Sequence, residues 1–100
     1  MDIRELTAKM DEFVAAKGWY QDGSPKPQTV RNMAISLAIE AAEVLEHVQW
    51  EEEPADLLAL ADELADVGLY LLQLAHVAGI DLEEAMLRKL ARNHQRNWGE

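Results

Sequence analysis

A leucine-rich segment between residues 56 and 78 most constrains what this chain can fold into. Its leucines, among them Leu57, Leu64 and Leu72, fall on nearly every side of an α-helix. A helix that is apolar all round lies at the centre of a fold or is covered by other chains. Gly79 follows the segment as a helix terminator. The other elements are therefore expected to pack around this helix.

Three further segments carry the spacing and capping signals of helices. They are residues 2–16, residues 29–50, and a C-terminal segment from 81 into the basic run that ends at Arg96. No strand pattern is visible. We therefore predict an all-α protein: a four-helix protomer with two central antiparallel acidic helices, assembling into an oligomeric helical bundle. The length predicts a single domain over residues 1–100.

The charge balance and composition exclude several classes of partner. The formal net charge of −10 argues against a nucleic-acid polymer, because phosphate backbones require basic patches. The absence of cysteine excludes disulfides and thiolate sites and suits a reducing compartment. The charged N-terminus does not resemble a signal peptide, and no apolar run reaches the length of a membrane span. We expect a cytoplasmic protein without a membrane partner.

Two pairs of carboxylates, each three residues apart, lie in the helical sequence: Glu40 with Glu43, and Glu63 with Asp66. No lysine or arginine occurs between residues 32 and 87. Residues three apart project from the same face of a helix, and an antiparallel hairpin would bring the two pairs together. Four carboxylates that face a common point require a cation to stay ionised. Mg²⁺ or Mn²⁺ suits such an all-oxygen site.

Two other interpretations of these acids stay open from the residues alone. The pairs could be solvated faces of acidic helices, although Glu40 falls inside the edge of an apolar sector, where an uncompensated carboxylate is costly. A ferritin-like di-iron bundle would also place carboxylates on facing helices, but it uses Glu-x-x-His motifs. Here His47 follows Glu43 by four residues instead of three.

The order and spacing of these motifs resemble the MazG-like, all-α NTP pyrophosphohydrolases. The two acid pairs, with nineteen residues between them, match the E-x-x-E…E-x-x-D signature of that family. The sequences Val-Gln-Trp at 48–50, Gly-Ile-Asp-Leu at 79–82 and Arg-Asn at 31–32 resemble its flanking motifs. The resemblance covers nearly the whole chain and is strongest to the small dCTP-pyrophosphatase-like branch.

The resemblance implies an enzyme that uses Mg²⁺, with Mn²⁺ as a substitute, to cleave nucleoside triphosphates to the monophosphate and pyrophosphate. It implies house-cleaning of the nucleotide pool, with dCTP-like or modified pyrimidine substrates favoured, by a homodimer or homotetramer. The implied metal ligands are Glu40, Glu43, Glu63 and Asp66. The implied substrate-binding residues are Trp19, Trp50, Tyr70, Lys89, Asn93, Arg31 and Asn32.

Glu43 and Glu46 are both candidates for the base in an in-line attack by water on the α- or β-phosphate. The chain departs from the family at two places. At position 10 it has Met10, where some relatives have a histidine near the nucleobase of the substrate. At residues 97–98 it has Asn-Trp in place of an Arg-Tyr-Pro-like sequence. Both departures concern nucleobase preference. Two alternatives to this interpretation remain. Within the family, the specificity could be all-α dUTPase-like or for modified nucleotides. Outside it, the chain could be a non-enzymatic acidic helical oligomerisation or adaptor module.

Overall fold

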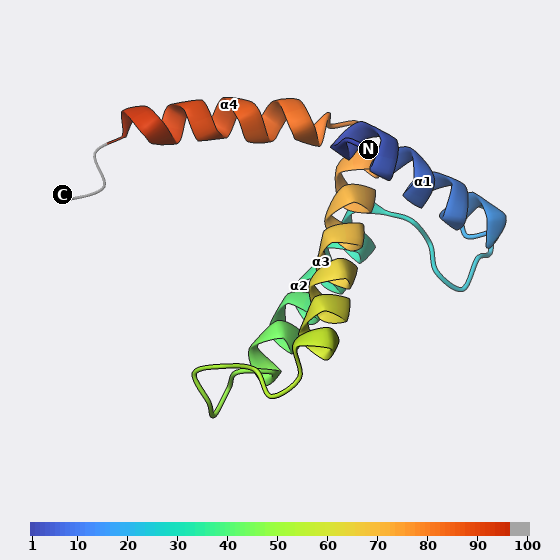
Figure 1. Ribbon diagram of the computed structural model, residues 1–100. Coiled ribbons are helices and arrows are strands. Elements are labelled where there is room, and N and C mark those ends of the chain that lie inside the picture. Colours follow the sequence, from blue (N-terminus) through green and yellow to red (C-terminus); the bar gives the residue numbers. More distant parts are fainter. Residues whose placement is uncertain (97–100) are drawn as a thin grey trace.

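The computed structural model describes residues 1–96, and its regular structure there is entirely α-helical. Four helices follow one another along the chain: α1 (Ile3–Ala16), α2 (Val30–Glu46), α3 (Leu57–Val77) and α4 (Leu82–Gln95) (Figure 1). Each begins after an Asp or Thr whose side chain accepts a hydrogen bond from the backbone N–H three residues later. The predicted all-α class is confirmed.

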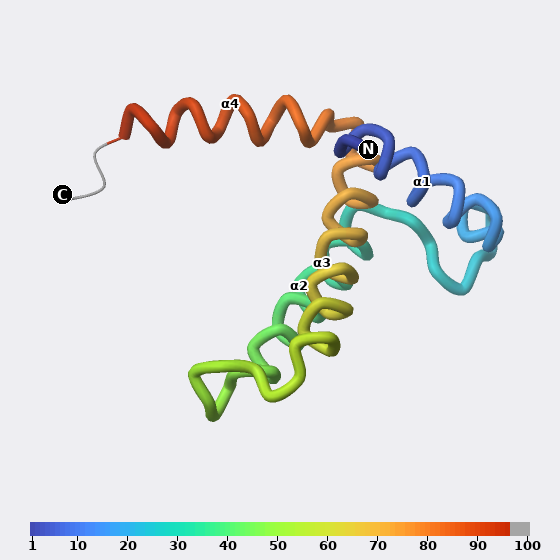
Figure 2. The backbone as a smooth tube through the Cα atoms, viewed as in Figure 1, coloured from blue at the N-terminus to red at the C-terminus, as the bar shows by residue number. Residues whose placement is uncertain are grey.

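α2 and α3 form an antiparallel hairpin, joined by the connection 47–56 at its far end (Figure 2). α3 also packs against α1, so the leucine-rich helix is central, as predicted. The core lies where α1, α2 and α3 meet. Its apolar members, each at most 6% exposed, are Val14, Met33, Leu72 and Ala75, and the side chain of Gln73 is fully buried among these helices.

α2 ends at Glu46, four residues before the end near Trp50 that the sequence predicts. The amides of His47 and Val48 bond to carbonyls three residues back, so the chain tightens into a turn there. The apolar residue Val48 keeps the helical spacing beyond this point, which is why the sequence favours a longer helix. Trp50 consequently lies in the connection and not on α2.

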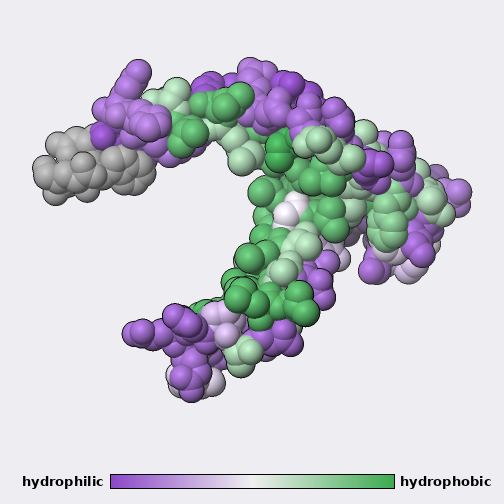
Figure 3. Space-filling view, viewed as in Figure 1, coloured by the Kyte–Doolittle hydropathy of each residue, from purple (hydrophilic) through white to green (hydrophobic). Residues whose placement is uncertain are grey.

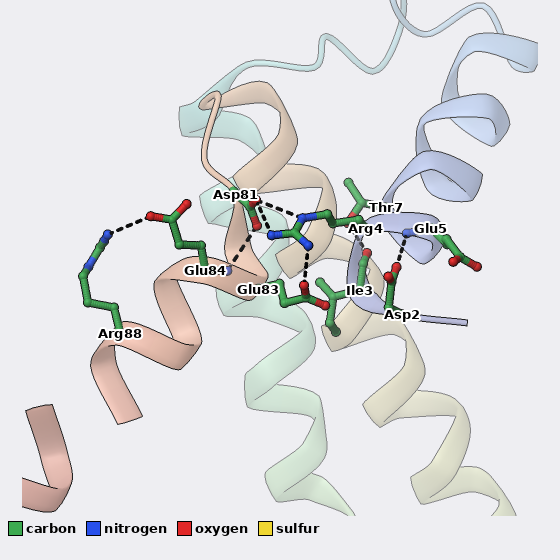
Figure 4. A network of polar contacts seen from close by, with 9 residues as sticks. All are labelled: Asp2, Ile3, Arg4, Glu5, Thr7, Asp81, Glu83, Glu84 and Arg88. Carbon is green, nitrogen blue, oxygen red and sulfur yellow. Dashed lines mark hydrogen bonds and ion pairs between the residues drawn. The ribbon is translucent and has the colours of Figure 1, made fainter. Parts of the chain in front are cut away.

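An ion-pair cluster fixes the start of α4 to the start of α1 (Figure 4). Two nitrogens of the Arg4 guanidinium lie 2.9 and 3.0 Å from Asp81 Oδ2, and its Nη1 lies 2.6 Å from Glu83 Oε2. The other oxygen of Asp81 caps α4 by accepting from the Glu84 amide at 3.1 Å. That capping bond and the bond from Arg4 lower the pKa of the Asp81 carboxyl. We call Arg4, Asp81 and Glu83 the α1–α4 clamp.

From this clamp α4 extends away from the hairpin, and the chain forms a bent, open shape (Figure 1). The radius of gyration is 16.0 Å, whereas a compact domain of this length has about 13 Å. The accessible surface is 7587 Å², compared with roughly 5,700 Å² for a compact monomer of this mass. The chain therefore exposes surface that a self-contained monomer would bury.

Much of the exposed surface is apolar. Large side chains are half or more exposed on α3 and α4: Leu57, Leu58, Leu64, Met86, Leu87 and Leu90. In the space-filling view, hydrophobic residues gather along the inner side of the bend, on the hairpin and on the underside of α4 (Figure 3). None of the helices in residues 1–96 has the length and hydropathy needed to cross a bilayer.

Candidate functional site

Three of the predicted carboxylates converge across the α2–α3 hairpin. Glu40 and Glu43 project from α2 and Glu63 from α3, and one carboxylate oxygen from each lies within 4.8 Å of the others. All three side chains are half-buried. Asp66 is one helical turn further along α3 and is not part of this group, but it lines the cavity beside it. We call Glu40, Glu43 and Glu63 the acid cluster.

The acid cluster is electrostatically incomplete. Oxygen Oε2 of Glu40 is buried, and no hydrogen-bond partner for it lies among the described residues. The neighbouring Glu63 carboxyl, and then burial, raise the pKa of Glu40, and the Glu40 carboxyl raises the pKa of Glu43. Like charges and burial both disfavour ionisation, and a divalent cation would remove both penalties. The donor set, which is all oxygen and anionic, fits Mg²⁺ or Mn²⁺.

Glu46 lies at the edge of the acid cluster. It lines a small open hollow together with Glu43, His47 and Glu63. His47 Nε2 is 3.7 Å from Glu63 Oε1, so the histidine borders the cluster. In the sequence His47 follows Glu43 by one helical turn. The sequence does not predict the contact of His47 with Glu63, because that contact depends on the register of the hairpin.

A cavity of about 680 Å³ lies on the side of α1, about one helical turn from the acid cluster: Ser36 and Asp66, which line it, are a turn from Glu40 and Glu63. Its walls come from α1, the loop 17–29, α2 and α3, and most of them are apolar or aromatic. Three predicted site residues besides Trp19 line it: Asn32, Asp66 and Tyr70. Ligand pockets combine apolar walls with a few placed polar groups, and this cavity has that character.

Trp19 stands in the cavity wall with its ring held on two sides. The ring makes a T-shaped contact with Phe13 at 5.6 Å between centroids. The Lys26 ammonium lies 4.6 Å from the ring centroid, so a cation covers part of one aromatic face. Lys9, Lys26 and Gln28 also line the cavity. The sequence did not predict these three: Lys26 and Gln28 lie in an irregular loop that carries no periodic signal, and Lys9 lies on α1 without a motif that marks it.

The remaining predicted residues are not brought together with the acid cluster within one chain. Trp50 is 85% exposed, Arg31 is exposed at the start of α2, and Lys89 is exposed on α4. Lys89 and Asn93 belong to the helix that leads away from the hairpin, and neither lines the cavity. Residues 97–98, where the sequence differs from the family motif, lie outside the described residues.

Comparison with known proteins gives consistent matches. The model of the MazG-like family matches residues 35–99. dCTP pyrophosphatase 1 from Mus musculus is 36% identical over 104 residues, and the protein of that name from Homo sapiens is also 36% identical. In both cases the match covers 95% of this chain and 56% of the relative. The chain thus spans about half the length of the curated relatives it matches.

A solved structure matches along almost its whole length. It is a pyrophosphatase from Archaeoglobus fulgidus, 34% identical, and the match covers 97% of this chain and 92% of that one with a TM-score of 0.74. The arrangement of helices described above is therefore shared with that protein, including the path of the chain from α1 to α4.

Proposed function

The chain belongs to the MazG-like family, and from this premise we propose that it hydrolyses nucleoside triphosphates to the monophosphate and pyrophosphate with a divalent cation. One observation carries the proposal: three carboxylates from two helices converge beside a largely apolar cavity that is large enough for a nucleoside. Asp66 lines that cavity one turn from Glu63 and so links the two sites. A phosphate chain held at the acid cluster could place its nucleoside in the cavity.

We assign the cation, Mg²⁺ first, to Glu40, Glu43 and Glu63, with Asp66 completing the set from the cavity side. When bound, such an ion neutralises charge on phosphate oxygens and makes water more acidic. We assign acceptance of the proton of the attacking water to Glu46 or Glu43, and the assignment is supported by their position at the edge of the same hollow. Hydrolysis of this kind depends on positioning and electrostatics and requires no covalent nucleophile.

The nucleobase is assigned to the cavity, where Trp19 offers an aromatic face. The Lys26 ammonium over that ring means that an entering base either displaces it or stacks beside it. Asn32 and Tyr70 lie in the same cavity wall as the metal ligand Asp66, at the proposed junction of sugar and phosphates. The dCTP-like preference is supported by the relatives named dCTP pyrophosphatase 1.

We further propose that the working site requires a second copy of this chain. Lys89 and Asn93 are on α4, which is fixed to α1 and extends away from the hairpin of its own chain. The exposed apolar residues of α3 and α4 and the excess surface suit an interface, since a stable one buries about 800 Å² on each partner. Lys89 would then meet the acid cluster of the second copy.

A direct test measures pyrophosphate release from a panel of deoxynucleoside and ribonucleoside triphosphates, with Mg²⁺ and with a chelator. We expect metal-dependent turnover of at least one pyrimidine deoxynucleotide, with the monophosphate as co-product. If no nucleotide is hydrolysed at saturating Mg²⁺ or Mn²⁺, the enzyme assignment is wrong, and the non-enzymatic oligomerisation module becomes the better account.

The thermal stability of the metal-free protein should fall as the pH rises toward neutral. Glu40 and Glu43 have pKa values raised above their ordinary 4.5, so the folded chain binds these protons more tightly than the unfolded chain. Their contribution to stability is complete below that value and is lost as the pH rises through the raised pKa values. Mg²⁺ should restore the melting temperature near pH 8 and have less effect near pH 4.5, the ordinary pKa of these carboxyls, where protons compete for the same oxygens.

Differential scanning fluorimetry with Mg²⁺ or with a chelator measures both effects. The matched control is Glu52→Gln in the exposed connection, which should leave the metal-induced shift unchanged. An equal Mg²⁺ shift at both pH values would contradict the assignment of the cation to the acid cluster.

A further inference from the structure

A chain of hydrogen bonds runs from the surface of α1 through the core to the cavity wall, and Gln73 is its centre. The Gln73 side chain is fully buried on α3. Its amide nitrogen donates to the Tyr20 hydroxyl oxygen at 3.0 Å and to Gln28 Oε1 at 2.9 Å. The Tyr20 hydroxyl in turn donates to Asp11 Oδ1 at 2.5 Å, and Gln28 Nε2 donates to the Lys26 carbonyl at 2.8 Å.

The direction of every bond in this chain is fixed from both ends. At one end the Asp11 carboxylate only accepts, so the Tyr20 hydroxyl must donate to it and its oxygen must accept from Gln73. Burial, reinforced by Asp11, raises the pKa of Tyr20, which keeps the donating proton in place. At the other end the Lys26 carbonyl also only accepts, so Gln28 must present its NH₂ there and its oxygen to Gln73.

The arrangement leaves one polar atom without compensation. Oxygen Oε1 of Gln73 is buried, and no hydrogen-bond partner for it occurs among residues 1–96. An apolar side chain of similar size would fill this place without leaving a buried acceptor unsatisfied. Packing alone therefore does not account for an amide here, whereas the two donated bonds do.

The bonds from Gln73 fix the orientation of the Gln28 side chain. Gln28 lines the cavity, whereas Gln73 does not. If the Gln28 amide turned over, its N–H groups would face those of Gln73 and its oxygen would face the Lys26 carbonyl. Both contacts would be repulsive, so the amide presents one fixed pattern of donor and acceptor. The same bonds hold the backbone of Lys26, whose ammonium covers the Trp19 ring.

We propose that Gln73 is a positioning residue for nucleobase selection, which acts by holding the Gln28 amide in one orientation at the cavity wall. This inference rests on the proposed hydrolysis of nucleotides. A fixed amide distinguishes a pyrimidine with an amino group from one with a carbonyl at the same ring position, because only one of them matches its donor and acceptor. An amide that is free to turn accommodates both.

The test compares kcat/KM for dCTP and dUTP, which differ at that ring position, in the wild-type chain and in Gln73→Met. Methionine keeps the volume and removes both donated bonds. We expect the ratio of the two kcat/KM values to move toward one by about fivefold, the worth of one neutral hydrogen bond. The kcat for the better substrate should change little, because the substitution leaves the proposed metal ligands and the carboxylate that accepts the proton of water unchanged.

Gln28→Leu, on the cavity side, should change the ratio as strongly, and the double variant Gln28→Leu/Gln73→Met should change it no further. Gln95→Met, an exposed glutamine on α4, is the matched control and should keep the wild-type ratio. A Gln73→Met enzyme that folds, hydrolyses and retains the wild-type ratio would overturn the proposal. So would additive effects in the double variant, because the two residues would then act separately.

A second measurement does not depend on activity. In ¹⁵N-labelled protein, the side-chain amide protons of Gln28 should be protected from solvent exchange in the wild type and lose that protection in Gln73→Met. Protection that persists in the variant would overturn the positioning role. Loss of protection in a chain that hydrolyses no nucleotide would support the structural half of the inference, and would show that the proposed function is what failed.

Discussion

Replacing Glu43 by glutamine should lower kcat/KM for every nucleotide by more than about a hundredfold while leaving the helical circular dichroism unchanged. Loss of a residue that merely orients a metal ligand costs up to about a hundredfold, so loss of a ligand should cost more. Glutamine keeps the shape of the side chain and can still offer an amide oxygen. It removes the negative charge that the acid cluster shares among Glu40, Glu43 and Glu63.

The same substitution should raise the melting temperature of the metal-free protein at neutral pH. The Glu40 carboxyl raises the pKa of Glu43, which means that the ionised form of Glu43 opposes folding. A neutral glutamine removes that opposition, so activity and metal-free stability should move in opposite directions. Steady-state assays and thermal melts with and without Mg²⁺ measure both. Glu52→Gln should change neither, and wild-type turnover by Glu43→Gln would refute the metal assignment.

Mixing two inactive variants should restore activity if two chains share each site. Glu43→Gln destroys the acid cluster and Lys89→Ala removes a charge from α4, and each is expected to be nearly inactive alone. In a mixed dimer one site receives both substitutions and the other receives neither. Equal mixing with free exchange should therefore recover about a quarter of the wild-type activity. The assay is pyrophosphate release after the two variants are unfolded and refolded together.

Two results would contradict this arrangement. A mixture no more active than its components would mean that Lys89 serves the acid cluster of its own chain or none. If the Lys89→Ala variant were fully active by itself, Lys89 would not be a residue of the active site. Arg92→Ala is a suitable companion, because it removes a neighbouring positive charge from the same helix without touching a predicted substrate contact. It should retain activity.

The features of this structure that follow from local sequence signals, such as helix caps and helical spacing, could be predicted. Helix starts at Thr29 and Asp81 follow from capping chemistry that is local in sequence, and the structure has both caps. The pairing of Glu40 and Glu43 with Glu63 followed from helical spacing and one antiparallel hairpin. The end of α2 was missed because Val48 keeps the apolar spacing while the backbone tightens into a turn.

Contacts that depend on the loop 17–29 could not be predicted. The place of Lys26 over Trp19 and of Gln28 in the cavity wall depends on how an irregular, proline-containing segment folds back onto α1 and α3. Gln73 illustrates the same limit from the other side. In the sequence it is one polar residue on a leucine-rich helix, and only the fold shows that it is buried and donates to two loop residues.

Because α4 is attached to the rest of the chain at the α1–α4 clamp, a small rotation there moves residues further along α4 by a larger distance. Lys89 is eight residues beyond Asp81, about 12 Å along the helix, so a rotation of about 10° at the clamp would displace it by roughly 2 Å. Displacements of about 1 Å can cost a hundredfold in turnover when a charge must meet a reacting group. If Lys89 serves the acid cluster of a second copy, as proposed, Arg4 would set how accurately that distant lysine is placed, although it touches neither the acid cluster nor the cavity. In the proposed shared site, mechanical stiffness at this exposed corner would be a determinant of catalytic rate.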